Sequence, residues 1–163
     1  MTIRAWTRLV TRRILHLGVS CFQAVRRVGW FITRPETVGV HGIPLTPEGK
    51  VVLVTLSYAH GWRLPGGGKN EAEDFSAAML RELREEIGLV SHESLELVSS
   101  FEHRLDFRRG KGSLFVIRGV RYRPKWSLEV KEVGEFDLGN LPENTAKITL
   151  QLIALAAPRL GDG

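Results

Sequence analysis

The chain has 163 residues, of which 43% are hydrophobic and 25% are charged. This length allows one domain with a substantial core but not two of ordinary size, and the composition excludes a disordered protein. A single cysteine, Cys21, excludes an internal disulfide framework and a zinc site built from several thiolates.

The positive charge of the chain is concentrated in its first 35 residues. The formal net charge is +5. Residues 1–35 hold seven arginines and no acidic residue, so they contribute +7, and subtracting this from +5 leaves −2 for residues 36–163. The basic field therefore belongs to this leader, and we expect no specific nucleic-acid partner for the domain that follows.

The leader has the periodicity of an amphipathic helix. Apolar residues recur at steps of three and four from Ile3 to Ile32, with arginines mostly on the other side, and Arg34 before Pro35 ends the pattern. We expect a helix at residues 1–35 that docks on a membrane surface or mediates self-association. We expect the protein in the cytoplasm, and peripheral to a membrane if the helix docks on one. An organelle transit peptide is the alternative.

The rest of the chain, residues 36–163, alternates strand and helix patterns. Strands are predicted at residues 38–45 and 51–58, joined in a hairpin by the turn at Pro47, Glu48 and Gly49. A glycine-rich loop, a helix at 74–87, strands at 95–105, 112–122 and 135–138 and a helix at 143–156 follow. This order predicts one α+β domain, an α/β/α sandwich with a mixed sheet.

The helix predicted at residues 74–87 carries a face of carboxylates. Glu82, Glu85 and Glu86 fall within one arc of about 100°. Glu82 and Glu86 are a like-charge i,i+4 pair, which costs a few tenths of a kcal/mol unless a cation neutralises it. Hard oxygen ligands at this density suit Mg²⁺ or Mn²⁺. The alternative is a solvated surface helix held by ion pairs such as Arg81 with Glu85.

The spacing around this helix is that of a known family. From Gly67 there are five residues, then Glu73, seven residues, then Arg81-Glu82-Leu83, one residue, Glu85-Glu86, one residue, and Gly88-Leu89. This pattern resembles the box of the Nudix hydrolases at every specified position. With the preceding stretch from Trp62 to Gly68, the resemblance extends over about residues 36–156.

The resemblance implies a Nudix-type sandwich that hydrolyses a nucleoside diphosphate linked to another group, by attack of water at phosphorus, with Mg²⁺ as cofactor and Mn²⁺ as a substitute. It implies that Glu82 activates the water and that Arg81 holds the glutamates, with Glu73 in support. The catalytic residues it implies are Arg81, Glu82, Glu85 and Glu86; the metal ligands are Glu82, Glu85, Glu86, Gly67 and Glu132; the substrate-binding residues are Arg63, Gly66, Gly67 and Gly68.

Three features of the site stay open at this level. Glu132 is favoured over Glu135 and Asp137 as a further ligand, and the alternative is that all three are solvated. His103 is a candidate base, although a lone histidine on a strand is more often structural. No marker of a family subgroup identifies the substrate, so nucleoside triphosphates are the default expectation. A non-catalytic nucleotide-binding or regulatory module is the alternative function, and the retained glutamates favour the enzyme.

Overall fold

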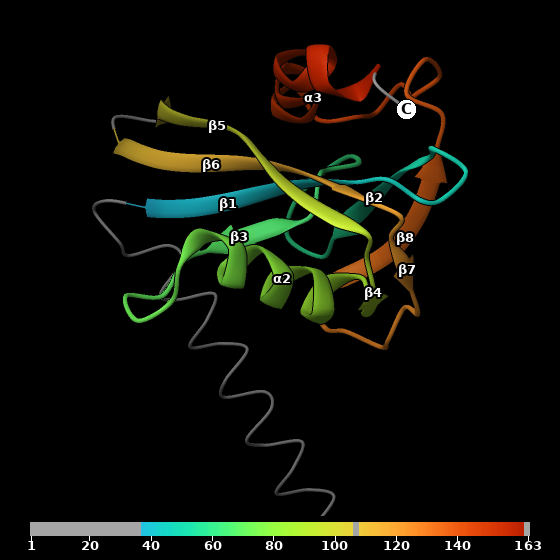
Figure 1. The fold of residues 1–163 in the computed structure, drawn as a ribbon, viewed down its shortest axis with the longest axis horizontal. Helices are drawn as coiled ribbons and strands as arrows, with labels where there is room; N and C mark the ends of the chain where they lie inside the picture. Colours follow the sequence, from blue (N-terminus) through green and yellow to red (C-terminus); the bar gives the residue numbers. More distant parts are fainter. Residues whose placement is uncertain (1–36, 106–107, 162–163) are drawn as a thin grey trace, which may run out of the picture. The chain divides into compact units, whose positions relative to one another are not determined.

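The computed structural model describes residues 37–105 and 108–161 (Figure 1). The leader helix predicted at residues 1–35 lies outside the described residues. The side chain of His103 lies outside them as well.

The largest sheet has four strands, and it is mixed. Its order is β3-β1-β6-β5, in which the central pair β1 and β6 runs parallel and the other neighbours run antiparallel. Val40 of β1 lies opposite Ser113 of β6 and, on the other edge, opposite Gly67 of β3. The strands are β1 (Thr37–Pro44), β3 (Gly66–Gly68), β5 (Ser94–Leu105) and β6 (Arg108–Arg118).

The predicted hairpin of the first two strands is wrong. The turn forms, since the amide of Gly49 donates to the carbonyl of Thr46, but the pairing stops at a single bridge between Leu45 and Val51. β2 (Val51–Leu56) instead pairs antiparallel with β8 (Val130–Phe136) in a second sheet. Both edges of β1 are already taken by β3 and β6, so β2 has no free edge there to join.

Two helices cover the strands from opposite sides, as the predicted sandwich requires (Figure 1). Helix α2 (Phe75–Glu86) buries Met79 and Leu83 in a core with residues of β1, β2 and β6. Helix α3 (Lys147–Leu160) buries Leu152 and Ala156 in a second core on the other side. The strands between the helices are therefore covered on both faces, and every residue from Val51 to Val54 of β2 is fully buried.

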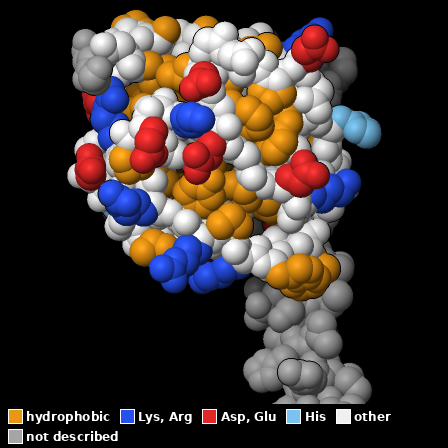
Figure 2. All heavy atoms as spheres, turned by 90° about the vertical axis from the view of Figure 1, so that its right-hand side faces the viewer, with side chains coloured by type: hydrophobic (Ala, Val, Ile, Leu, Met, Phe, Trp, Pro, Cys, Tyr) orange, Lys and Arg blue, Asp and Glu red, His pale blue; other side chains and the backbone are white. Residues whose placement is uncertain are grey.

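The remaining elements refine the predicted boundaries. The strand predicted at 112–122 is divided into β6 and β7 (Arg121–Tyr122), and β7 pairs with β4 (Leu89–Ser91). Among the described residues, no helix is long and apolar enough to cross a membrane. Figure 2 shows the face at the β7 and β8 end, where acidic and basic side chains are interspersed among hydrophobic ones, in keeping with the small net charge of residues 36–163.

Candidate active site

Helix α2 is fixed at both ends, and this sets the direction of its acidic face. At its start, Oδ1 of Asp74 accepts a hydrogen bond from the amide of Ala77 at 2.7 Å, which is a side-chain N-cap. At its end, Gly88 has φ 72°, and a Cβ there would lie 1.9 Å from the carbonyl oxygen of Arg123. Glycine ends the helix because no other residue fits against that backbone.

The three glycines of β3 lie directly against the charged residues of α2. The amide of Gly66 donates to Oε2 of Glu86 at 2.8 Å, and the carbonyl of Gly68 accepts from Nη2 of Arg81 at 2.7 Å. Between them, a Cβ on Gly67 would lie 2.6 Å from the carboxylate of Glu82. The missing side chain of Gly67 is therefore what allows Glu82 to reach the strand.

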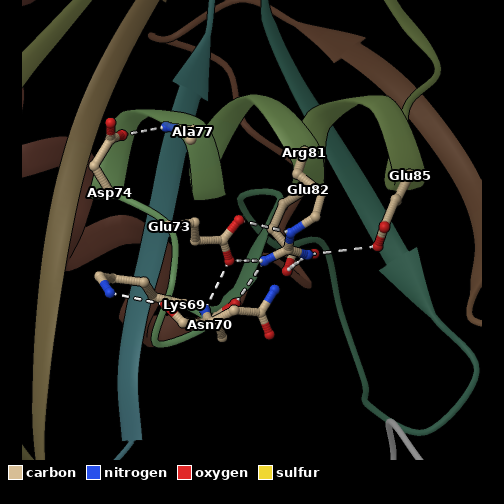
Figure 3. A network of polar contacts seen from close by, with 9 residues as sticks. Lys69, Asn70, Glu73, Asp74, Ala77, Arg81, Glu82 and Glu85 are labelled. Atoms are coloured by element: carbon tan, nitrogen blue, oxygen red, sulfur yellow. Dashed lines mark hydrogen bonds and ion pairs between the residues drawn. The ribbon is translucent and has the colours of Figure 1, made fainter.

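Arg81 joins the glutamates into one network, which Figure 3 shows from close by. Its guanidinium makes two hydrogen bonds to Glu73, one from Nε to Oε2 at 3.1 Å and one from Nη2 to Oε1 at 2.8 Å. Its Nη1 lies 2.6 Å from Oε1 of Glu82 and 3.6 Å from Oε2 of Glu85. The amide of Asn70 completes the network by donating to Glu73 at 2.7 Å. Such paired, charge-assisted bonds fix the position of a carboxylate more tightly than a single contact.

The glutamates differ in their burial and in the charges that act on them. Glu86 is only 7% exposed, and its pKa is raised well above the usual range by burial, and further by the charge of Glu82. Burial likewise raises the pKa of Glu82, while Arg81 opposes the rise. Hydrogen bonds from Arg81 lower the pKa of Glu73. The unfavourable negative charge is therefore concentrated at Glu82 and Glu86, where a cation would be stabilised most.

The structure adds a carboxylate that sequence reasoning missed. Glu129 lies just before β8, and its charge raises the pKa of both Glu82 and Glu86. The phenol of Tyr58 donates to its Oε1 at 2.6 Å. No local pattern marks Glu129, because its position depends on the pairing of β2 with β8. These two strands lie more than 70 residues apart in sequence.

The structure does not bring Glu132 to this cluster. Glu132 is exposed in β8 opposite Thr55. Because side chains alternate along a strand, it shares a face with Phe136, which packs in the core that contains α3 rather than the one that contains α2. Glu135 accepts a hydrogen bond from Tyr122 at 2.9 Å, and Asp137 follows the strand as an exposed residue. Which carboxylate near β8 serves as a further ligand therefore stays a prediction.

Arg63 is held beside the same region. Its backbone pairs with that of Val54 through two hydrogen bonds of 2.9 Å. Its charge lowers the pKa of Tyr58, although burial and Glu129 raise that pKa more strongly. Within the described part of the chain, no acceptor lies within hydrogen-bond distance of the buried Nε of Arg63. An unpaired cationic donor is suited to an anionic ligand.

The carboxylate oxygens of these glutamates are of the kind that bind a hard divalent cation, although the side chains do not converge on one point. Across residues 37–105 and 108–161, no three acidic, histidine or cysteine side chains are gathered into a ready-made metal-ligand set. Arg81 instead occupies an oxygen of Glu82 and approaches one of Glu85. Burial and the charges of Glu82 and Glu129 raise the pKa of Glu86, and negatively charged carboxylate oxygens are the ligands that Mg²⁺ and Mn²⁺ favour.

Fold and site together define a class of protein, an α/β/α sandwich in which a short glycine strand lies against a glutamate-bearing helix. A family model described as NUDIX domain matches residues 35–146. The chain belongs to the NUDIX family, as the spacing of its box predicted.

The chain is similar to curated RNA pyrophosphohydrolases over part of its length. It is 33% identical over 107 residues to that of Caulobacter vibrioides (strain NA1000 / CB15N), which covers 56% of this chain and 62% of the relative. It is 38% identical over 64 residues to that of Vibrio vulnificus (strain YJ016), which covers 39% of this chain and 37% of the relative. The chain thus spans less than two thirds of the length of these relatives.

Solved structures share the fold at lower identity. A MutT NUDIX hydrolase from Burkholderia pseudomallei has a TM-score of 0.64 and 21% identity, and the match covers 74% of this chain and 97% of that one. The NUDIX domain of Shewanella oneidensis NrtR complexed with ADP ribose has a TM-score of 0.62 and 23% identity, and covers 79% and 91%. These likenesses concern the fold alone.

Proposed function

We propose that the protein hydrolyses a pyrophosphate bond in a nucleotide-type substrate and that it requires a divalent cation. The observation that carries this proposal is the buried carboxylate of Glu86, which accepts a hydrogen bond from the amide of Gly66 and whose pKa is raised by burial and by the charges of Glu82 and Glu129. A buried carboxylate acted on by like charges is unfavourable in its ionised form unless a cation joins them. Family membership supports the proposal.

Glu82, Glu85 and Glu86 would hold the cation, with Glu129 in place of Glu132 as the further carboxylate and the backbone of Gly67 at the edge of the site. Mg²⁺, or Mn²⁺ in its place, supplies neutralisation of the charge on the phosphate oxygens and orientation of the attacking water. A solved structure of similar fold, a bifunctional NMN adenylyltransferase/ADP ribose pyrophosphatase from Francisella tularensis, is complexed with AMP and a Mn ion.

The residues of this chain divide the remaining work. Glu82, whose pKa is raised by burial, would be a stronger base than an exposed carboxylate and would accept the proton of the water. Arg81 and Glu73 hold Glu82 against β3. The positive charge of Arg63, whose buried Nε has no hydrogen-bond partner among the described residues, would attract a phosphate group, and Gly66 to Gly68 would give the substrate close access to the backbone.

Two substrate classes follow from different observations. The small net charge of residues 36–163 favours small nucleotides such as nucleoside triphosphates, since an RNA-binding surface is ordinarily basic. The curated relatives are named RNA pyrophosphohydrolases, which favours the 5′-triphosphate end of RNA and departs from our expectation of no nucleic-acid partner. The shared chemistry is a terminal pyrophosphate linkage.

A substrate panel tests the proposal. The full chain is incubated with nucleoside triphosphates, nucleotide sugars, ADP-ribose and a short 5′-triphosphate RNA, each with Mg²⁺, Mn²⁺ or EDTA, and released phosphate and pyrophosphate are measured. We expect turnover with either metal and none in EDTA. Binding of a nucleotide without turnover would support the alternative, a non-catalytic nucleotide-binding or regulatory module. Equal turnover by the parent and Glu86→Gln would refute the site.

We also propose that residues 36–163 form the hydrolase domain and that residues 1–35 dock it on a membrane surface or on a second copy. The support is the apolar periodicity and the seven arginines of this segment. Removing residues 1–34 should leave turnover intact and abolish liposome binding or self-association. If neither property changes, the segment is an address such as an organelle transit peptide.

A further inference from the structure

The chain contains two tyrosines, and the phenol of each donates to a glutamate. Tyr58 bonds Oε1 of Glu129 at 2.6 Å, and Tyr122 bonds Oε1 of Glu135 at 2.9 Å. The chemistry of the two pairs is the same, but their surroundings differ. Glu129 precedes β8 and its charge raises the pKa of Glu82 and Glu86, whereas Glu135 lies within β8 opposite Val52.

The backbone around Glu129 is tied to the loop that carries Tyr58. The carbonyl of Glu129 accepts a hydrogen bond from the amide of Ser57 at 2.8 Å. Oγ of Ser127 accepts from the amide of Glu129 at 3.1 Å and from that of Val130 at 3.2 Å. The segment after β2 and the segment before β8 are therefore joined at the point where their two strands meet, which leaves the side chain of Glu129 as the part still to be fixed.

The side chain of Glu129 needs such a restraint, because its neighbours repel it. Glu82 and Glu86 carry the same charge, and a free glutamate has several rotamers that lead away from them into water. A hydrogen bond from a neutral donor holds a carboxylate in place without cancelling its charge, in contrast to an ion pair with arginine. A tyrosine phenol has an ordinary pKa of about 10, so it remains a donor over the working pH range of enzymes.

The ring of Tyr58 contributes little to the core. Its exposed fraction is 53%, and it belongs to neither of the two hydrophobic clusters. Removing its hydroxyl should therefore leave the fold intact, so an effect on the reaction can be separated from an effect on stability.

We propose that Tyr58 is a positioning residue, which holds the carboxylate of Glu129 toward Glu82 and Glu86 so that Glu129 takes part in binding the cation. This role rests on the proposed function. Tyr58 acts through Glu129 and not on the substrate, and the consequence is that the effects of removing the two groups are not additive.

The test is a double-mutant cycle with a matched control. The parent, Tyr58→Phe, Glu129→Gln and the double variant are compared with Tyr122→Phe, which removes the same hydroxyl from the other tyrosine–glutamate pair. Turnover is measured on the substrate found by the panel, and Mn²⁺ affinity is measured calorimetrically without substrate. We expect Tyr58→Phe to lower kcat about tenfold and to change KM by less than about twofold, as for loss of one hydrogen bond to a charged group.

The same variant should weaken Mn²⁺ binding, whereas Tyr122→Phe should match the parent in both measurements. In the Glu129→Gln background, Tyr58→Phe should have no further effect. The role is refuted if Tyr58→Phe behaves like Tyr122→Phe in both measurements, or if it lowers kcat by the same factor with and without Glu129. Because Mn²⁺ binding needs no substrate, this result is distinguishable from failure of the proposed function, in which the parent and Glu86→Gln bind Mn²⁺ equally.

Discussion

The two ends of the acidic face of α2 are built in opposite ways. At one end, Arg81 pairs with Glu73 at 2.8 Å and with Glu82 at 2.6 Å. At the last turn, Glu86 is buried with a backbone amide from Gly66 and with like charges around it. The ion pairs of the first arrangement stabilise the fold. In the second arrangement like charges repel one another, and a bound cation would remove this repulsion.

The largest expected effect is at the unpaired end. Glu86→Gln keeps the shape of the side chain and removes its charge, so kcat should fall roughly a hundredfold or more. The folded protein should nevertheless become more stable in EDTA at neutral pH. The raised pKa of Glu86 means that parent stability is lost as pH rises from the ordinary value of 4.5 through the folded-state pKa.

Kinetics and urea unfolding of the same Glu86→Gln sample separate the two effects. The gain in stability should disappear below pH 4.5, where the carboxyl of Glu86 is neutral in both states. A variant that is both less active and less stable at neutral pH would contradict the view that Glu86 is a functional and not a structural residue.

The next effect concerns the contact between the glycine strand and the helix. Gly67→Ala places a Cβ 2.6 Å from the carboxylate of Glu82, whereas nothing lies within 4 Å of a Cβ on Gly68. Displacing Glu82 should lower kcat roughly tenfold to a hundredfold. Gly68→Ala, one residue along the same strand, should lower turnover less than Gly67→Ala, because its Cβ would not displace Glu82. Equal loss in the two variants would mean that the strand tolerates no side chain at all, and that Glu82 is not the reason.

A moderate effect is expected at the paired end. Arg81→Lys retains the charge but not the two-pronged bonding to Glu73, so the free energy of unfolding should fall by about 1 kcal/mol. Urea denaturation with and without Mn²⁺ measures this. The loss should be similar in both conditions, because the network joins protein groups to one another. A loss seen only with Mn²⁺ would show that Arg81 serves the cation and not the fold.

The smallest effect distinguishes the two downstream carboxylates. Glu132→Gln should change kcat by less than about twofold, because its side chain is exposed on the strand face that leads to the other core. Steady-state kinetics alongside Glu129→Gln make the comparison. A greater loss in Glu132→Gln than in Glu129→Gln would restore the sequence-based choice of Glu132.

Local features of the site could be predicted from the sequence, and long-range ones could not. Helix α2 was predicted at 74–87 and occupies Phe75–Glu86, because Asp74 and Gly88 mark its ends by local chemistry. Helical geometry predicted that Glu82 and Glu86 lie on the same face of the helix. Glu129 was missed because its place depends on which strand pairs with β2, and the hairpin was wrong because competition for the edges of β1 is a property of the whole sheet.

The central claim is that the buried glutamates of α2 bind a divalent cation. A crystal grown with Mn²⁺ and measured for anomalous scattering tests it most directly. We expect a peak within coordination distance of carboxylate oxygens of Glu82 and Glu86, with Glu129 beside it. A peak elsewhere on the molecule, or none at saturating Mn²⁺ while Glu86 keeps its bond to Gly66, would contradict it.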